Sequence, residues 1–191
     1  MPIKQVKIFM IKNKKHKGKH KNIEIKARCE DLNKIRKILI SHKADFIGLD
    51  HQIDTYFKVA SGRLKMREGN IENHLIFYKR ENISGPKKAD VTLFKNDPTS
   101  SLKDILEKSL GKLVVVDKKR EIYFIKNVKF HLDNVKGLGT FVEIEAQDEK
   151  IKLNEKELLK QCEYYLNLFE LKKGDMITGS YSDLLLKNDK K

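Results

Sequence analysis

The 191-residue chain has two cysteines, three prolines, no tryptophan and no long apolar run. A membrane-spanning helix needs about 20 consecutive apolar residues, so the sequence predicts a soluble protein without a membrane span. Cys29 and Cys162 stand far apart, outside any CxxC motif, and no signal peptide is evident. Both read as buried thiols in a reducing compartment, and we expect the protein to be cytoplasmic.

Several catalytic motifs are also missing. No GxxxxGK[ST] sequence is present, which argues against a P-loop nucleotide site. The six histidines show neither HExxH nor paired spacing, which argues against a zinc centre. No serine lies in a GxSxG elbow, and Cys29 has no evident base partner, so nucleophilic hydrolysis has no support.

Charged residues make up 36% of the chain, well above the usual share of about a quarter, and the net charge is +14. Residues 1–21 hold eight lysines and no acidic residue, so the remaining 170 residues carry +6. We predict that residues 1–21 form a disordered basic tail. Contact with nucleic acid is expected only through this tail; an anionic membrane, an import receptor or a purely solvating role are the alternatives.

Charge alternates with apolar residues in the short runs 22–28, 63–67 and 141–146. Successive side chains of a β-strand point to opposite faces, so each run has one apolar and one polar face. A single such run is typical of the solvated side of an antiparallel sheet. Several together favour a closed sheet with the charged faces inward. The neighbouring carboxylates Glu143 and Glu145 would repel each other unless a cation intervenes, and they suit Mg²⁺ or Mn²⁺.

Helical spacing of apolar residues predicts three helices, over 32–43, from 97–101 to 110, and over 154–169. Between them lie nine strand candidates, many separated by turn signals such as Ser61-Gly62. These candidates cover residues 22–29, 53–59, 63–68, 74–80, 90–95, 113–116, 120–126, 128–133 and 140–146. The pattern predicts one α+β domain dominated by antiparallel strands.

The opening run, Asn22-Ile23-Glu24-Ile25-Lys26, resembles the ExExK strand of the CYTH family. This family of triphosphate tunnel enzymes unites class IV adenylyl cyclases and thiamine triphosphatases. Further similar motifs follow in the family's order across residues 22–186. They are 64–67 (LRxR), 118–120 (KxR), 131–133, 137–145 and the closing segment 179–185.

This resemblance implies a closed eight-stranded antiparallel β-barrel, the triphosphate tunnel, with flanking helices. Residues 22–186 would form the catalytic domain and 187–191 a charged C-terminal tail. The motifs imply that Glu24, Asp133, Glu143 and Glu145 bind Mg²⁺ or Mn²⁺, and that Lys26, Glu143 and Glu145 are catalytic. The implied phosphate ligands are Lys26, Arg28, Lys65, Arg67, Arg80, Lys118 and Arg120.

The stretch 137–143 is most similar to the class IV adenylyl cyclase branch, which converts ATP to cyclic AMP and pyrophosphate. The alternatives are a triphosphatase that releases orthophosphate and a non-catalytic binder of polyphosphate or nucleotides. The lack of tryptophan disfavours thiamine triphosphate as substrate. Asn22 replaces the first glutamate of ExExK, and Lys65 stands where arginine is usual. A monomer or a homodimer is expected.

Overall fold

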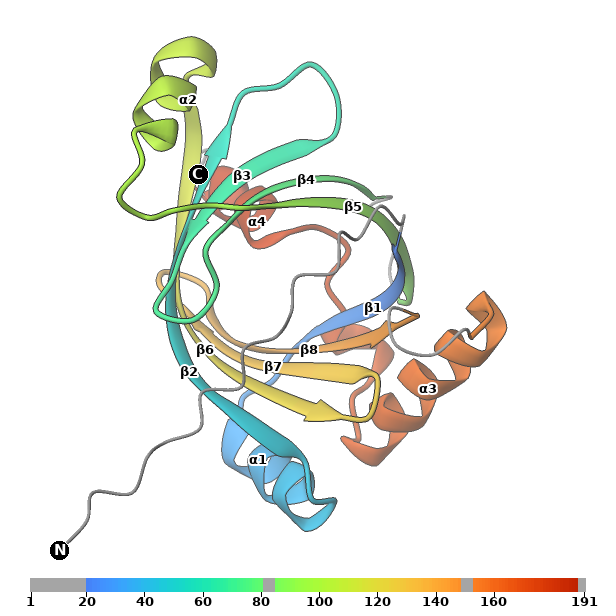
Figure 1. Ribbon diagram of the computed structural model, residues 1–191. Helices are drawn as coiled ribbons and strands as arrows, with labels where there is room; N and C mark the ends of the chain where they lie inside the picture. The colour runs from blue at the N-terminus through green and yellow to red at the C-terminus, as the bar shows by residue number, and fades with distance from the viewer. Residues whose placement is uncertain (1–19, 81–84, 149–152, 189–191) are drawn as a thin grey trace, which may run out of the picture.

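In the computed structural model, eight strands close into an antiparallel barrel, seen end-on in Figure 1. The structure describes residues 20–80, 85–148 and 153–188. The predicted α+β fold, a closed eight-stranded barrel with flanking helices, is confirmed. Around the barrel the order is β1-β5-β4-β3-β2-β6-β7-β8. The strands are β1 His20–Arg28, β2 Asp45–Phe57, β3 Arg63–Glu68, β4 His74–Arg80, β5 Lys87–Lys95, β6 Lys112–Ile125, β7 Val128–Val135 and β8 Gly139–Gln147.

The largest differences from the predicted strands lie in β6 and β2. The candidates 113–116 and 120–126 form one strand, β6, and β2 begins at Asp45 instead of residue 53. Gly48 explains the second difference, because it has a positive φ of 148° and the register with β6 shifts between Phe46 and Gly48. This irregularity breaks the alternation by which a strand is recognised.

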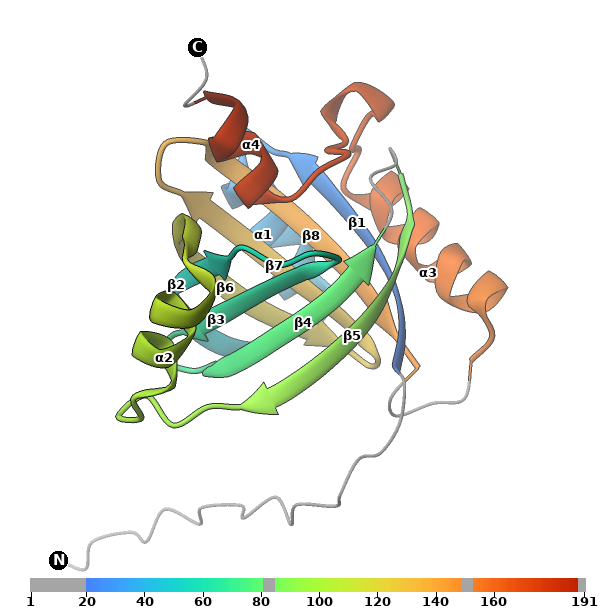
Figure 2. The ribbon, with the colours of Figure 1, turned by 90° about the horizontal axis from the view of Figure 1, so that it is seen from above.

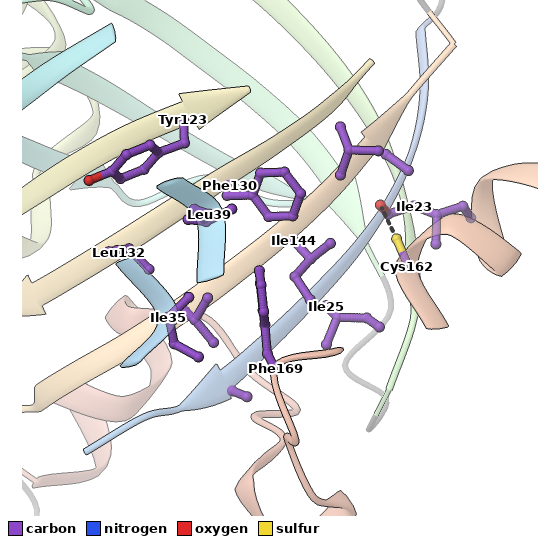
Figure 3. Packing of buried hydrophobic residues seen from close by; sticks show 14 of the residues in the cluster. Ile23, Ile25, Ile35, Leu39, Tyr123, Phe130, Leu132, Ile144, Cys162 and Phe169 are labelled. Atoms are coloured by element: carbon purple, nitrogen blue, oxygen red, sulfur yellow. Dashed lines mark hydrogen bonds between the residues drawn. The ribbon is translucent and has the colours of Figure 1, made fainter. Parts of the chain in front are cut away.

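Two of the predicted helices cover the outside of β1, β7 and β8. Helix α1 (Leu32–Ser41) begins after Asp31, whose side chain accepts a hydrogen bond from the Lys34 amide, and α3 (Glu155–Leu168) begins with an Asn154–Glu157 capping box. Their buried side chains join the outward apolar residues of the strands in the main core (Figure 3). In this core the Cys162 thiol donates to the Ile23 carbonyl at 3.2 Å.

The third predicted helix, α2 (Leu102–Leu110), buries none of its residues, and Ile105 is 55% exposed. A helix that the sequence did not predict, α4 (Tyr181–Asn188), follows a reciprocal cap in which the Ser180 amide donates to Asp183 and the Asp183 amide donates to the Ser180 hydroxyl. Helix α4 extends two residues into the segment expected to be a C-terminal tail. Residues 1–19 of the predicted basic tail lie outside the described part of the chain, and β1 begins at His20.

Within the described ranges, no helix has both the length and the apolar character that crossing a membrane requires.

Candidate functional site

The alternation in β1 directs Ile23 and Ile25 into the outer core and Asn22, Glu24 and Lys26 into the barrel. The same period-two pattern in the other strands lines one cavity of about 620 Å³ with charged groups. Its charged lining consists of Glu24, Lys26, Asp54, Lys65, Arg67, Glu72, Lys118, Arg120, Lys129, Glu143 and Glu145.

The segment that leads into α4 lies at one end of the barrel (Figure 2), and its buried residues Ser180 and Tyr181 line the cavity at this closed end. The buried Tyr181 lines the cavity, its hydroxyl donates to Asp133 at 2.7 Å, and its ring lies 4.9 Å from that of Phe141. Arg63, at the start of β3, pairs with Asp183 at 2.8 Å and holds α4 across this end. The opposite end opens to the surface, where the lining residue Leu93 is 58% exposed.

Three cations surround the carboxylate of Asp54 on β2. Arg67 donates through Nε at 2.8 Å and through Nη2 at 3.0 Å, Lys65 donates at 2.8 Å and Lys118 at 2.7 Å. Asp54 is only 1% exposed, and burial alone would raise its pKa. Arg67, Lys118 and Lys65 outweigh burial and hold the pKa well below its usual value. One buried carboxylate thus fixes the positions of three cationic side chains, of the kind that bind phosphate.

A second cluster forms around Glu143 on β8. Its carboxylate lies 2.6 Å from Lys26 Nζ and accepts from Arg120 Nη2 at 2.8 Å. Arg120 also donates through Nε to Asp133 at 2.6 Å. Burial alone would raise the pKa of Glu143, but Arg120 and Lys26 hold it well below its usual value. Lys26 also lies 3.8 Å from the centre of the Tyr181 ring, which faces the same cavity.

His131 on β7 lies beside this second cluster. Its Nδ1 is 2.9 Å from Glu143 Oε2. Because a carboxylate only accepts hydrogen bonds, we assign the proton to Nδ1. Burial, helped by Arg120 and Lys129, lowers the pKa of His131 to about 4, so the ring is neutral at pH 7. Its buried Nε2 finds no partner among the described residues, so its lone pair is left without a donor.

Most of the predicted site residues come together in this cavity, with three exceptions. Arg28 is exposed, donates to the Leu138 carbonyl at 2.9 Å and does not line the cavity. Asp133 is fully buried beside Arg120, beneath the cavity surface. The side chain of Arg80 lies outside what the structure describes. The roles expected for these three residues stay predictions.

Several lining residues were not predicted, among them the ionisable side chains of Asp54, Glu72, Lys129 and Tyr181. Two of these residues had a signal in the sequence, because Asp54 shares the parity of Gln52 and Tyr56, and Lys129 shares the parity of His131 and Asp133. Glu72 and Tyr181 lie outside the strands, where alternation carries no information.

The carboxylates suit a divalent cation in their chemistry. Glu24 and Glu145 are cross-strand partners on β1 and β8, and Glu143 shares the inward face of β8. Oxygen ligands of this kind are preferred by Mg²⁺ and Mn²⁺. Among the residues that the structure describes, no three His, Cys, Asp or Glu side chains are already grouped for a metal. The Glu143 carboxylate is already paired with Lys26 and Arg120. It can bind a metal ion only if the ion replaces at least one of these contacts.

Asn22, the departure from ExExK, lies at this group of carboxylates. Its Nδ2 donates to Glu145 Oε1 at 2.6 Å, and Asn22 and Gln147 are cross-strand partners. A glutamate at this position would face Glu145 with a second negative charge. Compared with a glutamate, Asn22 removes one negative charge from this group and supplies a hydrogen-bond donor to Glu145.

Comparison with known proteins gives consistent results. A family model described as the CYTH domain matches residues 20–181. A protein of Methanocaldococcus jannaschii named "Putative adenylate cyclase" is 27% identical over 171 residues, which is 85% of this chain and 97% of that protein.

Solved structures show the same barrel. A protein of Pyrococcus horikoshii OT3 is 25% identical, with a TM-score of 0.67 over 85% of this chain and 98% of that one. A protein from Hippeastrum, described as a putative adenylyl cyclase with a dominant triphosphatase activity, is 15% identical. Its TM-score is 0.55 over 89% of this chain and 96% of that one.

Proposed function

Because the chain belongs to the CYTH family of metal-dependent triphosphate tunnel enzymes, we propose that it acts on a triphosphate as a class IV adenylyl cyclase does, converting ATP to cyclic AMP and pyrophosphate. The observation that supports this most is the gathering of six lysine and arginine side chains around a cavity that also carries carboxylates. The name of the Methanocaldococcus relative supports cyclisation.

The proposed phosphate ligands inside the cavity are Lys26, Lys65, Arg67, Lys118 and Arg120. A triphosphate carries about four negative charges, which cations on rigid strands neutralise without the cost of ordering a loop. Arginine binds phosphate oxygens through two donors, whereas lysine acts as a point charge. All five side chains now contact carboxylates, which the phosphate oxygens would replace.

In the proposed reaction the ribose 3′ hydroxyl releases its proton to water and its oxygen attacks the α-phosphorus. The bond from that phosphorus to the bridging oxygen breaks, and pyrophosphate leaves. We propose Glu24, Asp133, Glu143 and Glu145 as the residues that hold Mg²⁺ or Mn²⁺, which when bound supplies Lewis-acid polarisation of the phosphate oxygens. Lys26 and Arg120, close to Glu143, orient the phosphates and stabilise the negative charge that develops on the leaving group.

The product identifies the reaction. We expect purified protein incubated with ATP and Mg²⁺ or Mn²⁺ to yield cyclic AMP and pyrophosphate, resolved by chromatography. Orthophosphate as the main product, from ATP or from tripolyphosphate, would contradict cyclisation and select the triphosphatase.

Triphosphate hydrolysis is the second candidate function. The Hippeastrum protein shares the fold, and its description reports a dominant triphosphatase activity. In hydrolysis, water instead of a ribose oxygen attacks, and it attacks the terminal phosphorus. The same cations and carboxylates serve both reactions, so only the products separate them.

Asn22 favours a third candidate, a non-catalytic binder, and leads to a prediction. We expect Asn22→Glu to lower the melting temperature in EDTA by about 4 °C, because a donor is lost and two carboxylates repel each other. Excess Mg²⁺ or Mn²⁺ should reverse the loss, as followed by circular dichroism.

Asn22→Gln, which keeps the amide, is the matched control and should show no metal dependence. If the melting temperature of Asn22→Glu is the same with and without Mg²⁺ or Mn²⁺, a cation site at Glu145 is contradicted. Turnover that appears only in Asn22→Glu would identify the natural chain as a binder.

A further inference from the structure

The turn between β3 and β4 is built to direct one carboxylate, that of Glu72, into the cavity. On β2, the Asp50 carboxylate accepts from the backbone amides of Ile71 at 2.9 Å and Glu72 at 3.1 Å. The Asn73 side chain closes the turn, because it accepts from the Gly69 amide at 3.1 Å and donates to the Gly69 carbonyl at 2.8 Å. A Cβ atom at Gly69 would stand 2.7 Å from Asp50, so this close approach requires glycine.

Both oxygens of Glu72 are bound to cations. Oε2 accepts from Arg67 Nη1 at 2.7 Å and from Gln52 Nε2 at 3.1 Å, and Oε1 accepts from Lys129 Nζ at 2.6 Å. Arg67 lies on β3 and Lys129 on β7, with β2 and β6 between them, so the carboxylate bridges two separate parts of the wall. Glu72 thus occupies a position with two converging cationic donors, which is the environment that a phosphate group requires.

The position of Glu72 along the barrel matters as much as its contacts. It follows the end of β3, whereas Arg63 at the start of β3 pairs with Asp183 at the closed end. Glu72 therefore stands toward the open end, and Arg67 lies between it and Asp54, because Arg67 donates to both carboxylates. A phosphate chain that binds the deeper cations around Asp54 and lengthens toward this end meets Glu72.

We propose that Glu72 limits the number of phosphate groups that the cavity accepts, by filling with its own carboxylate the anion subsite formed by Arg67 and Lys129. This inference rests on the proposed function, since it assumes that a triphosphate binds the deeper cations. A fourth phosphate would meet a fixed negative charge and two cations already occupied. The carboxylate thereby selects triphosphates against longer linear polyphosphates.

The test measures binding and needs no turnover. Dissociation constants of tripolyphosphate and linear tetrapolyphosphate are measured by calorimetry in EDTA and in Mg²⁺. In Glu72→Gln, we expect the affinity for tetrapolyphosphate to rise relative to tripolyphosphate by at least about tenfold, because a like charge is removed and two cations are released. A ratio within about twofold of the natural chain would overturn the proposal.

Three further variants separate this role from net charge and from folding. Glu68→Gln removes the same charge from the same hairpin, where Glu68 pairs with Lys103, and should leave the ratio unchanged. Adding Lys129→Gln to Glu72→Gln restores the net charge but removes one donor of the subsite, and should abolish the gain. If Glu72→Gln does not fold, Glu72→Ala removes the same carboxylate; an unchanged ratio there would overturn the proposal, and a raised one would support it.

The proposed function can fail separately from this inference. Absence of turnover on every triphosphate would contradict the function, whereas the ratio of the two dissociation constants tests Glu72 alone.

Discussion

Replacing Glu143 and Glu145 together by glutamine is expected to lower kcat for the triphosphate by at least about 10³-fold, which corresponds to about 4 kcal/mol of transition-state stabilisation. Two of the carboxylates proposed to hold the metal lose their charge. Lys26 loses its anionic partner Glu143 in the same change, and Arg120 keeps only Asp133, so both side chains stay available for phosphate. The loss should therefore fall on kcat, while KM stays the same or decreases.

Steady-state kinetics with Mg²⁺ and Mn²⁺ separates the two parameters, and Mn²⁺ binding by electron paramagnetic resonance gives a reading independent of turnover. Glu163→Gln, on the exposed face of α3, is a control for the loss of a negative charge. It should change neither the steady-state kinetics nor Mn²⁺ binding. Unchanged Mn²⁺ binding in the double variant would contradict the metal assignment, even if turnover fell.

The inward faces of the strands could be predicted from the sequence because parity along a strand is a local property. Glu24 and Lys26 alternate with Ile23 and Ile25, and the structure places the first pair in the cavity and the second in the core. The same holds for Glu143, opposite Lys26 across β1 and β8. Alternation alone fixes the face once the sheet closes.

Depth along the barrel could not be predicted in the same way. Arg28 continues the alternation of Glu24 and Lys26, yet it lies at the end of β1, where it contacts Leu138 and the ring of Phe141 instead of the cavity. Parity tells which way a side chain points, but not whether the cavity reaches it.

The remaining misses lie where the pattern is interrupted or absent. Gly48 breaks the alternation of β2 ahead of Asp50, and so concealed the first part of this strand, before residue 53. Glu72 depends on a turn fixed by long-range hydrogen bonds to Asp50. Helix α4 had a local signal in Ser180 and Asp183, but its position across the barrel depends on tertiary contacts.

The largest expected effect on stability comes from Asp54→Asn. Its carboxylate is the shared partner of three buried or nearly buried cations, and the variant leaves them facing one another. Removing one partner from a buried ion cluster costs about 3–5 kcal/mol, and we expect the free energy of unfolding, from urea titration at pH 7, to fall by that amount. Asp117→Asn, which breaks an exposed pair with His51, is the control and should cost less than about 1 kcal/mol.

The pH dependence of this loss follows from the direction of the pKa shift. The pKa of Asp54 is lower in the folded chain than its unfolded value of about 3.9. Its contribution to stability is therefore fully present above pH 4 to 5 and is lost as the pH falls through the folded pKa. The difference in the free energy of unfolding between Asp54→Asn and the natural chain should therefore shrink below pH 4. From pH 5 to pH 8, the ionisation of Asp54 should leave this difference constant. A difference that grows toward low pH would contradict the assignment.

Adding Lys118→Met to Asp54→Asn should recover part of the lost stability, because it removes the most deeply buried of the three cations left unpaired. Neighbouring residues of one ionic network couple by about 0.5–3 kcal/mol, so recovery of at least about 1 kcal/mol is expected in the same urea titration. Tripolyphosphate affinity should not recover, since Lys118 is itself a proposed phosphate ligand. If the double variant regains stability while its affinity for tripolyphosphate stays low, the Asp54 carboxylate serves to position these cations for the substrate. The fold itself then does not require the charge of Asp54. No recovery of stability would show instead that the Asp54 carboxylate is required by the packing of the barrel wall.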